Sequence, residues 1–527
     1  MFHRSWTGLG RPLPMMEMIP AFSHLPIPVI AGRAVLSDPP MTTPCYHSHQ
    51  RDNASPITRS FPSSTRGRIT PSRSGEQFEI LNPHAVCSSP HGCANQMRLR
   101  SAGIPCILIA LLLGCIIVAG NITTPETPAY ELQRPRNVQS TAVILPPFGG
   151  NYNTQLVLLG TTGGVGWWAD TTRASSSSAL LVGDTIYIID LGQGSTARLA
   201  EAFVRNDFVF AKGGRIEDGS SISLQKVRAV FFTHLHQDHT ADYPAFLLIG
   251  PGAGLGMHTD PVTQKTSIVP VKIFGPGSRG ELEADKTNYL NRSGTIVETY
   301  DGQTSPGLRQ MTSLIWQAYA QTINDMTLDN GYPDFTRLVT ITEIGGSGPG
   351  DIPIPADVPD PNADTCPAME PFPVYSDENI RVTAILVNHS QVYPSFAYRF
   401  DTPDGSIVFS GDTGIVTNGN LQRLANGADI LVHEVIDEAW IDVKFGTPAE
   451  GTQMAALKTH MQNSHTKISD VGRIAEECNV STLVLNHIVP GNTPKMRLMQ
   501  AQQNFSGKLI VGEDLMRIGI RKFGRAW

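Results

Sequence analysis

The stretch "THLHQDHTAD", residues 233–242, places three histidines and two aspartates in ten positions of a chain in which only 17% of the residues are charged. The apolar run directly before it, "VRAVFF", is typical of a buried β-strand. In an extended chain, residues two apart lie on the same face, so His234 and His236 can point to one spot. The turn that follows brings Asp238 and His239 to the same place, so four side chains of metal-binding types converge.

Metal binding is the interpretation that this cluster favours. Imidazole and carboxylate ligands together suit a divalent cation such as zinc. A His-x-His pair alone more often means two surface imidazoles, but Asp238 and His239 at the end of an apolar strand favour a metal site. Beyond residue 120 the chain has only two cysteines, Cys366 and Cys478, so the site must be built from histidine and carboxylate. Asp242 is expected to cap the following helix and not to bind the metal.

The first 120 residues differ from the rest. Residues 1–96 are rich in Pro, Ser, His and Arg and lack an apolar period, which predicts disorder. Residues 97–120 contain two arginines and then an apolar run, Ile104–Gly120, in the layout of a secretory signal peptide. This run is also just long enough for a membrane anchor through 104–120, which is the alternative. A signal peptide implies that 1–96 is an over-extended reading frame, whereas an anchor implies that 1–96 is a genuine tail. The predicted location is therefore exported (periplasmic or extracellular) or membrane-anchored.

The remainder is predicted to contain a linker at 121–150 and one domain at 151–527. The domain opens with apolar strands, two of which flank a Gly183-Asp184 turn of the type favoured in hairpins, and a helix is expected at 195–210. Three further candidate ligands each follow an apolar run that is typical of a strand. They are His389 after 382–387, Asp412 after 407–409 and His487 after 483–485.

Taken in order, the motifs of this domain resemble those of the metallo-β-lactamase superfamily, in its ribonuclease Z and arylsulfatase-like branch. The motifs are "LLGTTGG", "IIDLGQG", "FFTHLHQDH", "LVNHS", "FSGDTG", "LVHEV", "NSHT" and "VLNHIVP". Their common order along 151–527 is more specific than any single motif. The resemblance implies an α/β fold, a four-layer αβ/βα sandwich with two sheets face to face and helices outside, and the alternation of apolar strands with helical stretches agrees with it.

The resemblance also implies a centre with two zinc ions per chain. Two adjacent zinc ions lower the pKa of a bridging water toward ~7 and stabilise the charge that develops on a phosphorus, sulfur or carbonyl centre. The implied function is therefore that of a dinuclear zinc-dependent hydrolase. The first zinc would take His234, His236 and His389, the second Asp238, His239 and His487, and Asp412 would bridge them.

Protonation of the leaving group needs a further residue. "LVHEV" supplies His433 and Glu434 and "NSHT" supplies His465, which resemble the HEAT and HST motifs of ribonuclease Z. In that family the glutamate orients the second histidine, which delivers the proton. The match is partial because valine and threonine replace alanine and serine. We therefore predict Asp238, Glu434 and His465 as catalytic residues, whereas His433 fits a buried strand histidine equally well.

An insertion at about 250–380 interrupts the family pattern. Residues 305–326 have apolar residues at three- to five-residue steps, which predicts a helix whose apolar face packs on the core. As an alternative to this packing role, Trp316 and Tyr319 could line a substrate entrance. Residues 348–373 contain eight prolines and are expected to form an extended lid edge or connector.

Charge decides between substrate classes. Residues 1–120 carry ten arginines and five acidic residues, which leaves 30 basic and 42 acidic residues in 121–527. This acidic body lacks the basic footprint of an enzyme that grips RNA. We therefore expect a small sulfate, phosphodiester or related ester as substrate. A ribonuclease Z-type tRNA 3′ endonuclease and a non-catalytic metal-binding module are the alternatives, and a homodimer stays open.

Overall fold

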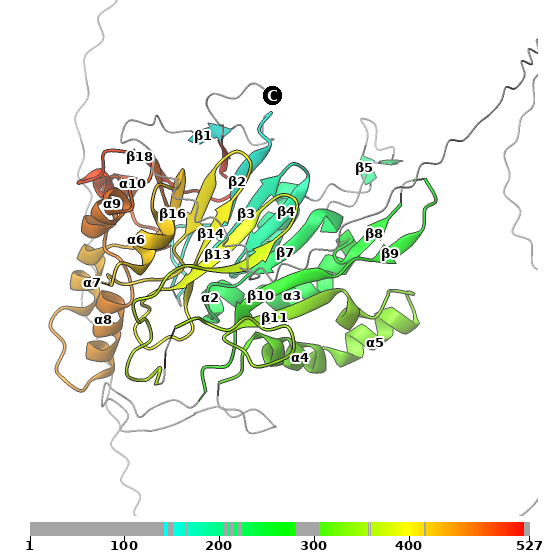
Figure 1. Cartoon of the computed structure of the whole chain (residues 1–527), viewed down its shortest axis with the longest axis horizontal. Helices are drawn as coiled ribbons and strands as arrows, with labels where there is room; N and C mark the ends of the chain where they lie inside the picture. Colours follow the sequence, from blue (N-terminus) through cyan, green and yellow to red (C-terminus); the bar gives the residue numbers. More distant parts are fainter. Residues whose placement is uncertain are drawn as a thin grey trace, which may run out of the picture. The chain divides into compact units, whose positions relative to one another are not determined.

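Two large β-sheets form the centre of the protein (Figure 1). A computed structural model describes residues 142–145, 151–280 and 305–520, with gaps at 165, 204–207, 211–215, 219–223, 261, 357, 359 and 416–417. Within these residues, sheet A has the strand order β1-β19-β2-β3-β4-β7-β10-β11, and sheet B has the order β12-β13-β14-β15-β16-β17-β18. Both sheets mix parallel and antiparallel pairs.

The bounds of the elements are as follows. Sheet A contains β1 (Ala142–Leu145), β2 (Thr154–Gly160), β3 (Ser177–Val182), β4 (Thr185–Ile189), β7 (Val227–Phe231), β10 (Val271–Pro276), β11 (Val339–Ile344) and β19 (Arg517–Ile520). Sheet B contains β12 (Phe372–Ser376), β13 (Arg381–Leu386), β14 (Phe396–Asp401), β15 (Ser406–Phe409), β16 (Ile430–Ile436), β17 (Thr482–Val489) and β18 (Lys508–Val511). Two small hairpins pair β5 (Phe208–Phe210) with β6 (Ile216–Asp218) and β8 (Met257–Thr259) with β9 (Thr266–Ile268). The helices are α1 (Ser195–Phe203), α2 (Gln237–Thr240), α3 (Tyr243–Ile249), α4 (Leu308–Ala318), α5 (Ala320–Leu328), α6 (Asn420–Ala425), α7 (Glu438–Phe445), α8 (Gln453–Asn463), α9 (Ile468–Glu477) and α10 (Lys495–Leu498).

The alternation of side chains along the strands builds the layers. On β4, Tyr187 and Ile189 belong to the core cluster shared with sheet B, whereas Ile186 and Ile188 belong to the cluster shared with the helices of sheet A. Helix α6 packs on β13 and β14, and α9 packs on β16, so helices also cover the outer face of sheet B (Figure 1). The predicted four-layer αβ/βα sandwich is therefore confirmed.

The local predictions have mixed outcomes. The hairpin around Gly183 is confirmed, with β3 ending and β4 beginning on either side of the turn. The helix expected at 195–210 is too long, because α1 ends at Phe203 and Phe208–Phe210 forms β5. Within the linker expected at 121–150, Ala142–Leu145 forms β1, which pairs with β19 and extends sheet A, and the rest of that range lies outside the described residues.

The insertion adds helices beside sheet A and a connection to sheet B. The helix expected at 305–326 is two helices, α4 and α5, which meet at Tyr319. Leu308 is buried and Trp316 packs against two apolar clusters, in agreement with a packing face, whereas Tyr319 is 46% exposed. The proline-rich stretch 348–373 connects β11 of sheet A to β12 of sheet B, as the connector interpretation expected.

The predictions for residues 1–96 and 97–120 lie outside the described residues. In the part of the chain that the structure describes, no helix is long and apolar enough to cross a membrane.

Candidate metal centre

The seven predicted ligands come from both sheets and gather at one edge of the sandwich. Strand β7 of sheet A leads into the histidine-rich stretch, and strands β13, β15 and β17 of sheet B supply the rest. In each of two clusters, the candidate ligand atoms lie within 4.8 Å of one another. The clusters are His234, His236, His389 and Asp412, and Asp238, His239, Asp412 and His487. These are the two expected ligand sets, and metal binding by them stays a prediction.

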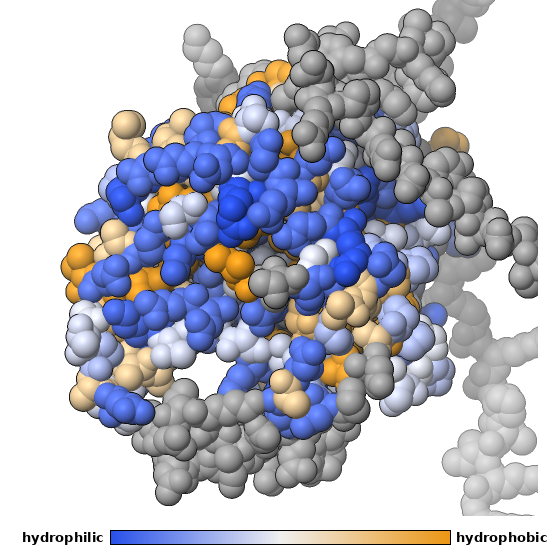
Figure 2. Space-filling view, turned by 60° about the vertical axis from the view of Figure 1, so that its left-hand side comes forward, coloured by the Kyte–Doolittle hydropathy of each residue, from blue (hydrophilic) through white to orange (hydrophobic). Residues whose placement is uncertain are grey.

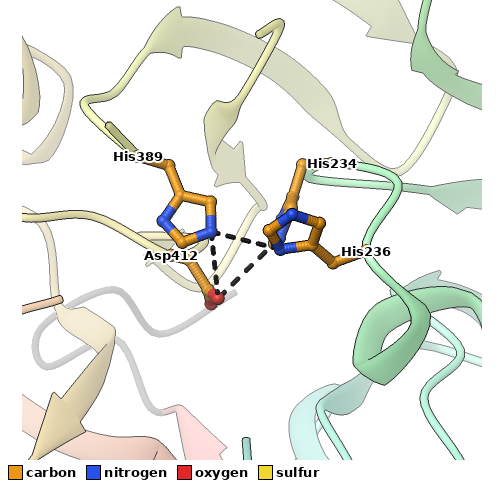
Figure 3. Close-up of side chains that lie close together, drawn as sticks. All are labelled: His234, His236, His389 and Asp412. Carbon is orange, nitrogen blue, oxygen red and sulfur yellow. Dashed lines mark hydrogen bonds and ion pairs between the residues drawn. The ribbon is translucent and has the colours of Figure 1, made fainter. Parts of the chain in front are cut away.

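The first cluster surrounds one oxygen of Asp412 (Figure 3). Asp412 Oδ2 lies 3.8 Å from His234 Nε2 and 3.7 Å from His389 Nε2. His236 Nδ1 lies 3.3 Å from His389 Nε2. Nitrogen atoms of three imidazoles therefore face the space beside one carboxylate oxygen, which suits a single cation.

The second cluster uses the same carboxylate. His239 Nε2 lies 3.2 Å from Asp412 Oδ1, and His487 Nε2 lies 3.1 Å from Asp412 Oδ2. Asp238 Oδ2 is 3.2 Å from His487 Nε2. Because both clusters include Asp412, this residue is the one placed to bridge two cations.

His487 reaches the centre through an irregularity in its strand. The sequence placed it directly after a strand, but it lies inside β17. The register between β16 and β17 shifts beside it, so that Asn486 and Ile488 are paired and His487 is skipped, and its φ is +43°. Such bulges re-aim a side chain, and here the bulge accounts for the direction of His487.

A glycine pair packs against the second cluster. The Gly164 N–H donates a hydrogen bond of 2.7 Å to Asp238 Oδ2. A Cβ atom on Gly163 would lie 2.0 Å from Cε1 of His487, which is too close for any other residue type. The "TTGG" turn therefore lets the backbone approach the imidazole of His487.

The outward-facing ring nitrogens of three histidines have buried partners. His239 Nδ1 lies 2.9 Å from Asp190 Oδ2, and His389 Nδ1 lies 2.9 Å from the carbonyl oxygen of Ser464. Thr233 Oγ1 lies 3.1 Å from His234 Nδ1. Such contacts fix the orientation of a metal-binding imidazole. Asp190 was not among the predicted residues, although it stands in the motif "IIDLGQG" at the end of β4.

The charges of the centre suit a cation. Burial lowers the pKa of His234 and His389 well below its usual value, which keeps both imidazoles neutral. Burial alone would raise the pKa of Asp412, but His487 and His239 lower it well below its usual range. His234 Nε2, His239 Nε2 and Asp412 Oδ1 are buried and make no hydrogen bond of acceptable geometry among the described residues, although the last two lie 3.2 Å apart. Buried orphan atoms that all face one another fit a bound metal ion.

Glu434 and His465 form a pair next to this centre. Glu434 Oε1 lies 3.1 Å from His465 Nδ1 and accepts a 2.9 Å hydrogen bond from the N–H of Thr413. The His465 ring centroid lies 5.2 Å from that of His389 and 5.7 Å from that of His487. Burial would lower the pKa of His465, but Glu434 raises it above its usual value.

Three other residues near the centre can be compared with the sequence predictions. His433 is fully buried in β16, in agreement with the strand interpretation. Asp242 does not cap the following helix, because its carboxylate instead accepts hydrogen bonds from the N–H and hydroxyl of Thr196 in α1. His460 of α8 was missed, and its ring centroid lies 5.8 Å from that of His465. No motif marked it, because its place depends on how α8 packs.

Comparison with known proteins shows which proteins the chain is similar to. A family model described as a beta-lactamase superfamily domain matches residues 350–488. This match and the relatives below support the metallo-β-lactamase superfamily for this chain. Two proteins named ribonuclease Z, from Mycolicibacterium paratuberculosis (strain ATCC BAA-968 / K-10) and Mycobacterium avium (strain 104), are each 24% identical over 371 residues, which cover 69% of this chain and 98% of the relative. These relatives support the ribonuclease Z branch of that superfamily for this chain.

Among solved structures, human tRNase Z, short form, is 18% identical with a TM-score of 0.40, and the match covers 69% of this chain and 99% of that one. A metallo-beta-lactamase fold protein from Bacillus subtilis is 14% identical with a TM-score of 0.38, covering 69% and 98%.

Proposed function

We propose that the protein is a metal-dependent hydrolase of ester bonds whose centre holds two zinc ions. The observation that carries this proposal is the sharing of Asp412 by two clusters that are otherwise separate. Two divalent cations bound there would supply a hydroxide at neutral pH and stabilise negative charge on the reacting ester. The residues that would hold them are His234, His236 and His389 for one, Asp238, His239 and His487 for the other, and Asp412 for both.

In this proposal the protein supplies the proton for the leaving group. Glu434 is held by the N–H groups of Thr413 and Thr466, so its Oε1 has a fixed position. It therefore orients the His465 ring through Nδ1 and, as a buried carboxylate, favours the protonated form of that ring. The other ring nitrogen, Nε2, is then the atom that can give a proton to the departing oxygen.

The substrate that we propose is a small sulfate, phosphodiester or related ester. The acidic balance of residues 121–527 supports this class over a polyanionic substrate. The loop after the Gly163-Gly164 pair supports an aryl group: Trp168 packs edge-to-face on Trp440 with ring centroids 5.5 Å apart, and Trp167 is 88% exposed. Trp168 is half-buried, and its indole N–H donates to the carbonyl oxygen of Gly163, which packs against His487. The exposed ring of Trp167 beside it offers a surface on which an aromatic substrate group can stack.

A tRNA 3′ endonuclease is the second candidate. It is favoured by the relatives named ribonuclease Z, because the similarity extends over 98% of their length. The two candidates share the centre and differ only in what lies around it.

One set of assays separates these functions. The purified protein is given p-nitrophenyl sulfate, p-nitrophenyl phosphate, bis(p-nitrophenyl) phosphate and an acyl ester, beside a precursor tRNA with a 3′ trailer. We expect turnover of a small ester that stops on chelation and returns with zinc. Cleavage of the tRNA alone would establish the second candidate. Two bound metal ions without turnover of any substrate would indicate a non-catalytic metal-binding module.

We propose in addition that the protein is exported or anchored through residues 104–120. N-terminal sequencing of the mature protein tests this proposal. A first residue shortly after 120 supports a cleaved signal peptide, a retained 104–120 segment in the membrane fraction supports an anchor, and a soluble chain that keeps these residues contradicts both.

A further inference from the structure

The outward-facing ring nitrogen of His487 lacks the buried hydrogen-bond partner that the Nδ1 atoms of His234, His239 and His389 have. His487 Nε2 faces Asp238 and Asp412, so Nδ1 is the nitrogen that points away from the candidate metal site. This Nδ1 is buried and has no hydrogen-bond partner in the described part of the chain. Metal-binding histidines almost always give this second N–H to a carboxylate, a carbonyl or a water. For His487, no group of the described residues fills that role.

A small cavity lies beside His487, between the two sheets. Its volume is about 30 Å³, and its walls come from β3, β4 and the segments after β4 and β7 on one side, and from β15, β16, β17 and the turn after β15 on the other. The candidate ligands His239 and Asp412 also line it. One water needs roughly 10–15 Å³, so the cavity has room for about two. Five of its wall residues have a buried polar atom without a hydrogen-bond partner among the residues described. These atoms are Ser178 Oγ, His433 Nε2, Glu434 Oε2, Asn486 Oδ1 and His487 Nδ1.

The hydrogens on these atoms define what can fill the cavity. His433 Nδ1 lies 2.7 Å from the carbonyl oxygen of Glu434, which can only accept, so Nδ1 carries the proton and Nε2 is an acceptor. His487 Nδ1 carries a proton both when Nε2 binds a metal and when the ring is an imidazolium, so it is a donor. The missing group must accept from His487 and donate to His433. A water does both and keeps a second hydrogen for Asn486 Oδ1 or Glu434 Oε2.

We propose that two buried waters occupy this cavity and that His433 is a positioning residue, which holds His487 in its metal-binding orientation through one of them. The part that concerns metal binding rests on the proposed function. The proposal also explains why a histidine stands at position 433 in β16, whose other residues apart from Glu434 are aliphatic.

A high-resolution crystal structure tests the waters without any metal. We expect one water within hydrogen-bond distance of both His487 Nδ1 and His433 Nε2, and a second beside Asn486 Oδ1 or Ser178 Oγ. An empty cavity, or a direct contact between the two histidines, would overturn the proposal.

Metal affinity tests the role of His433. In His433→Leu we expect the affinity of the second site to fall about 10- to 100-fold, the usual effect of losing such an outer contact, while the first site is unchanged. His433→Gln keeps an acceptor and should recover part of the affinity. Ser178→Val, which fills the cavity from the opposite sheet, should reproduce the loss even if His433→Leu fails to fold. Ser195→Ala removes another buried, unpartnered hydroxyl that does not line the cavity and serves as the control.

The outcomes separate this proposal from the proposed function. A wild-type protein that binds no metal contradicts the proposed function, and the crystallographic waters then still decide the occupancy of the cavity. A wild-type protein that binds two metal ions, with His433→Leu and Ser178→Val binding both equally well, contradicts the role of His433 alone.

Discussion

The substitution Gly163→Ala tests how closely the glycine turn is fitted to the metal centre. The added Cβ would lie 2.0 Å from Cε1 of His487 and 2.2 Å from both ring nitrogens. Ordinary contact begins at 3.4 Å, so a separation of about 1.4 Å must be gained. The backbone cannot easily provide it, because the Gly163 N–H donates to the carbonyl of Ile488 and the Gly164 N–H donates to Asp238. We therefore expect the imidazole of His487 to move.

The size of the effect follows from the length of a zinc bond. A Zn–N bond is about 2.0–2.1 Å long, so a ligand displaced by more than 1 Å no longer binds. Loss of an outer contact already costs 10- to 100-fold in metal affinity, and displacement of the ligand itself should cost at least about 100-fold, or about 2.7 kcal/mol. Only the second site should be affected, because His487 belongs to the cluster of Asp238, His239 and Asp412 and not to the cluster of the first site.

Titration with zinc against a competing chelator measures the two affinities separately. Gly166→Ala is the matched control, since a Cβ at Gly166 in the same loop meets nothing within 4 Å. Thermal unfolding of the metal-free variants shows whether Gly163→Ala is folded. If a folded Gly163→Ala binds two zinc ions as tightly as the wild type, then the position of His487 in this structure is not the one that binds metal.

Three further predictions follow from the same geometry. Asp412→Ala should lower the metal content below that of the wild type and abolish hydrolysis, because two adjacent cations lose their shared carboxylate. Metal analysis and the ester assay measure both effects, and an unchanged metal content would show that Asp412 is not the bridge. His465→Ala should keep both metals but lose roughly 10²–10⁴-fold in the rate of hydrolysis of an alkyl ester. The rate on a p-nitrophenyl ester should fall little, because that leaving group needs no proton. Equal losses on the two esters would contradict a role of His465 as the acid. Burial would raise the pKa of Asp377, but hydrogen bonds from the Asn379 N–H and from the hydroxyls of Tyr375 and Tyr187 lower it. Its stabilising effect should therefore be present above about pH 4 and fade as the pH falls through the lowered pKa, so the stability advantage of the wild type over Asp377→Asn in urea unfolding should narrow from pH 7 to pH 3.

Much of the architecture could be predicted because its signals are local. The apolar run before the histidine-rich stretch becomes β7, whose end faces sheet B, and the Gly183-Asp184 turn ends one strand and begins the next. The spacing of His234 and His236 already places both rings on one side of an extended chain. The order of motifs then brings His389 and Asp412 to the same place, since each follows a strand of sheet B.

The missed features depend on contacts between distant segments. Asp190 has a φ of +58° after β4, and its carboxylate reaches His239 and Thr233, which are more than forty positions away in the sequence. The direction of the His487 side chain depends on a bulge between two parallel strands, and no residue type in "VLNHIVP" predicts that bulge. Asp242 looked like a helix cap because its neighbours are helical, but the Thr196 N–H and hydroxyl bind its carboxylate.

The centre depends on the alignment of two sheets that contribute different ligands, and the structure contains direct links that fix this alignment. The carbonyl of Thr233, just before His234, accepts a 2.9 Å hydrogen bond from the N–H of Phe396 in β14. The hydroxyl of Tyr398 in the same strand donates 2.8 Å to the carbonyl of Phe232. These bonds join the end of β7 to sheet B one residue before the first ligand, so a slip of one sheet against the other would break them and leave buried backbone carbonyls unpaired. Each such loss costs about 1–3 kcal/mol, so these bonds oppose a slip between the two halves of the centre.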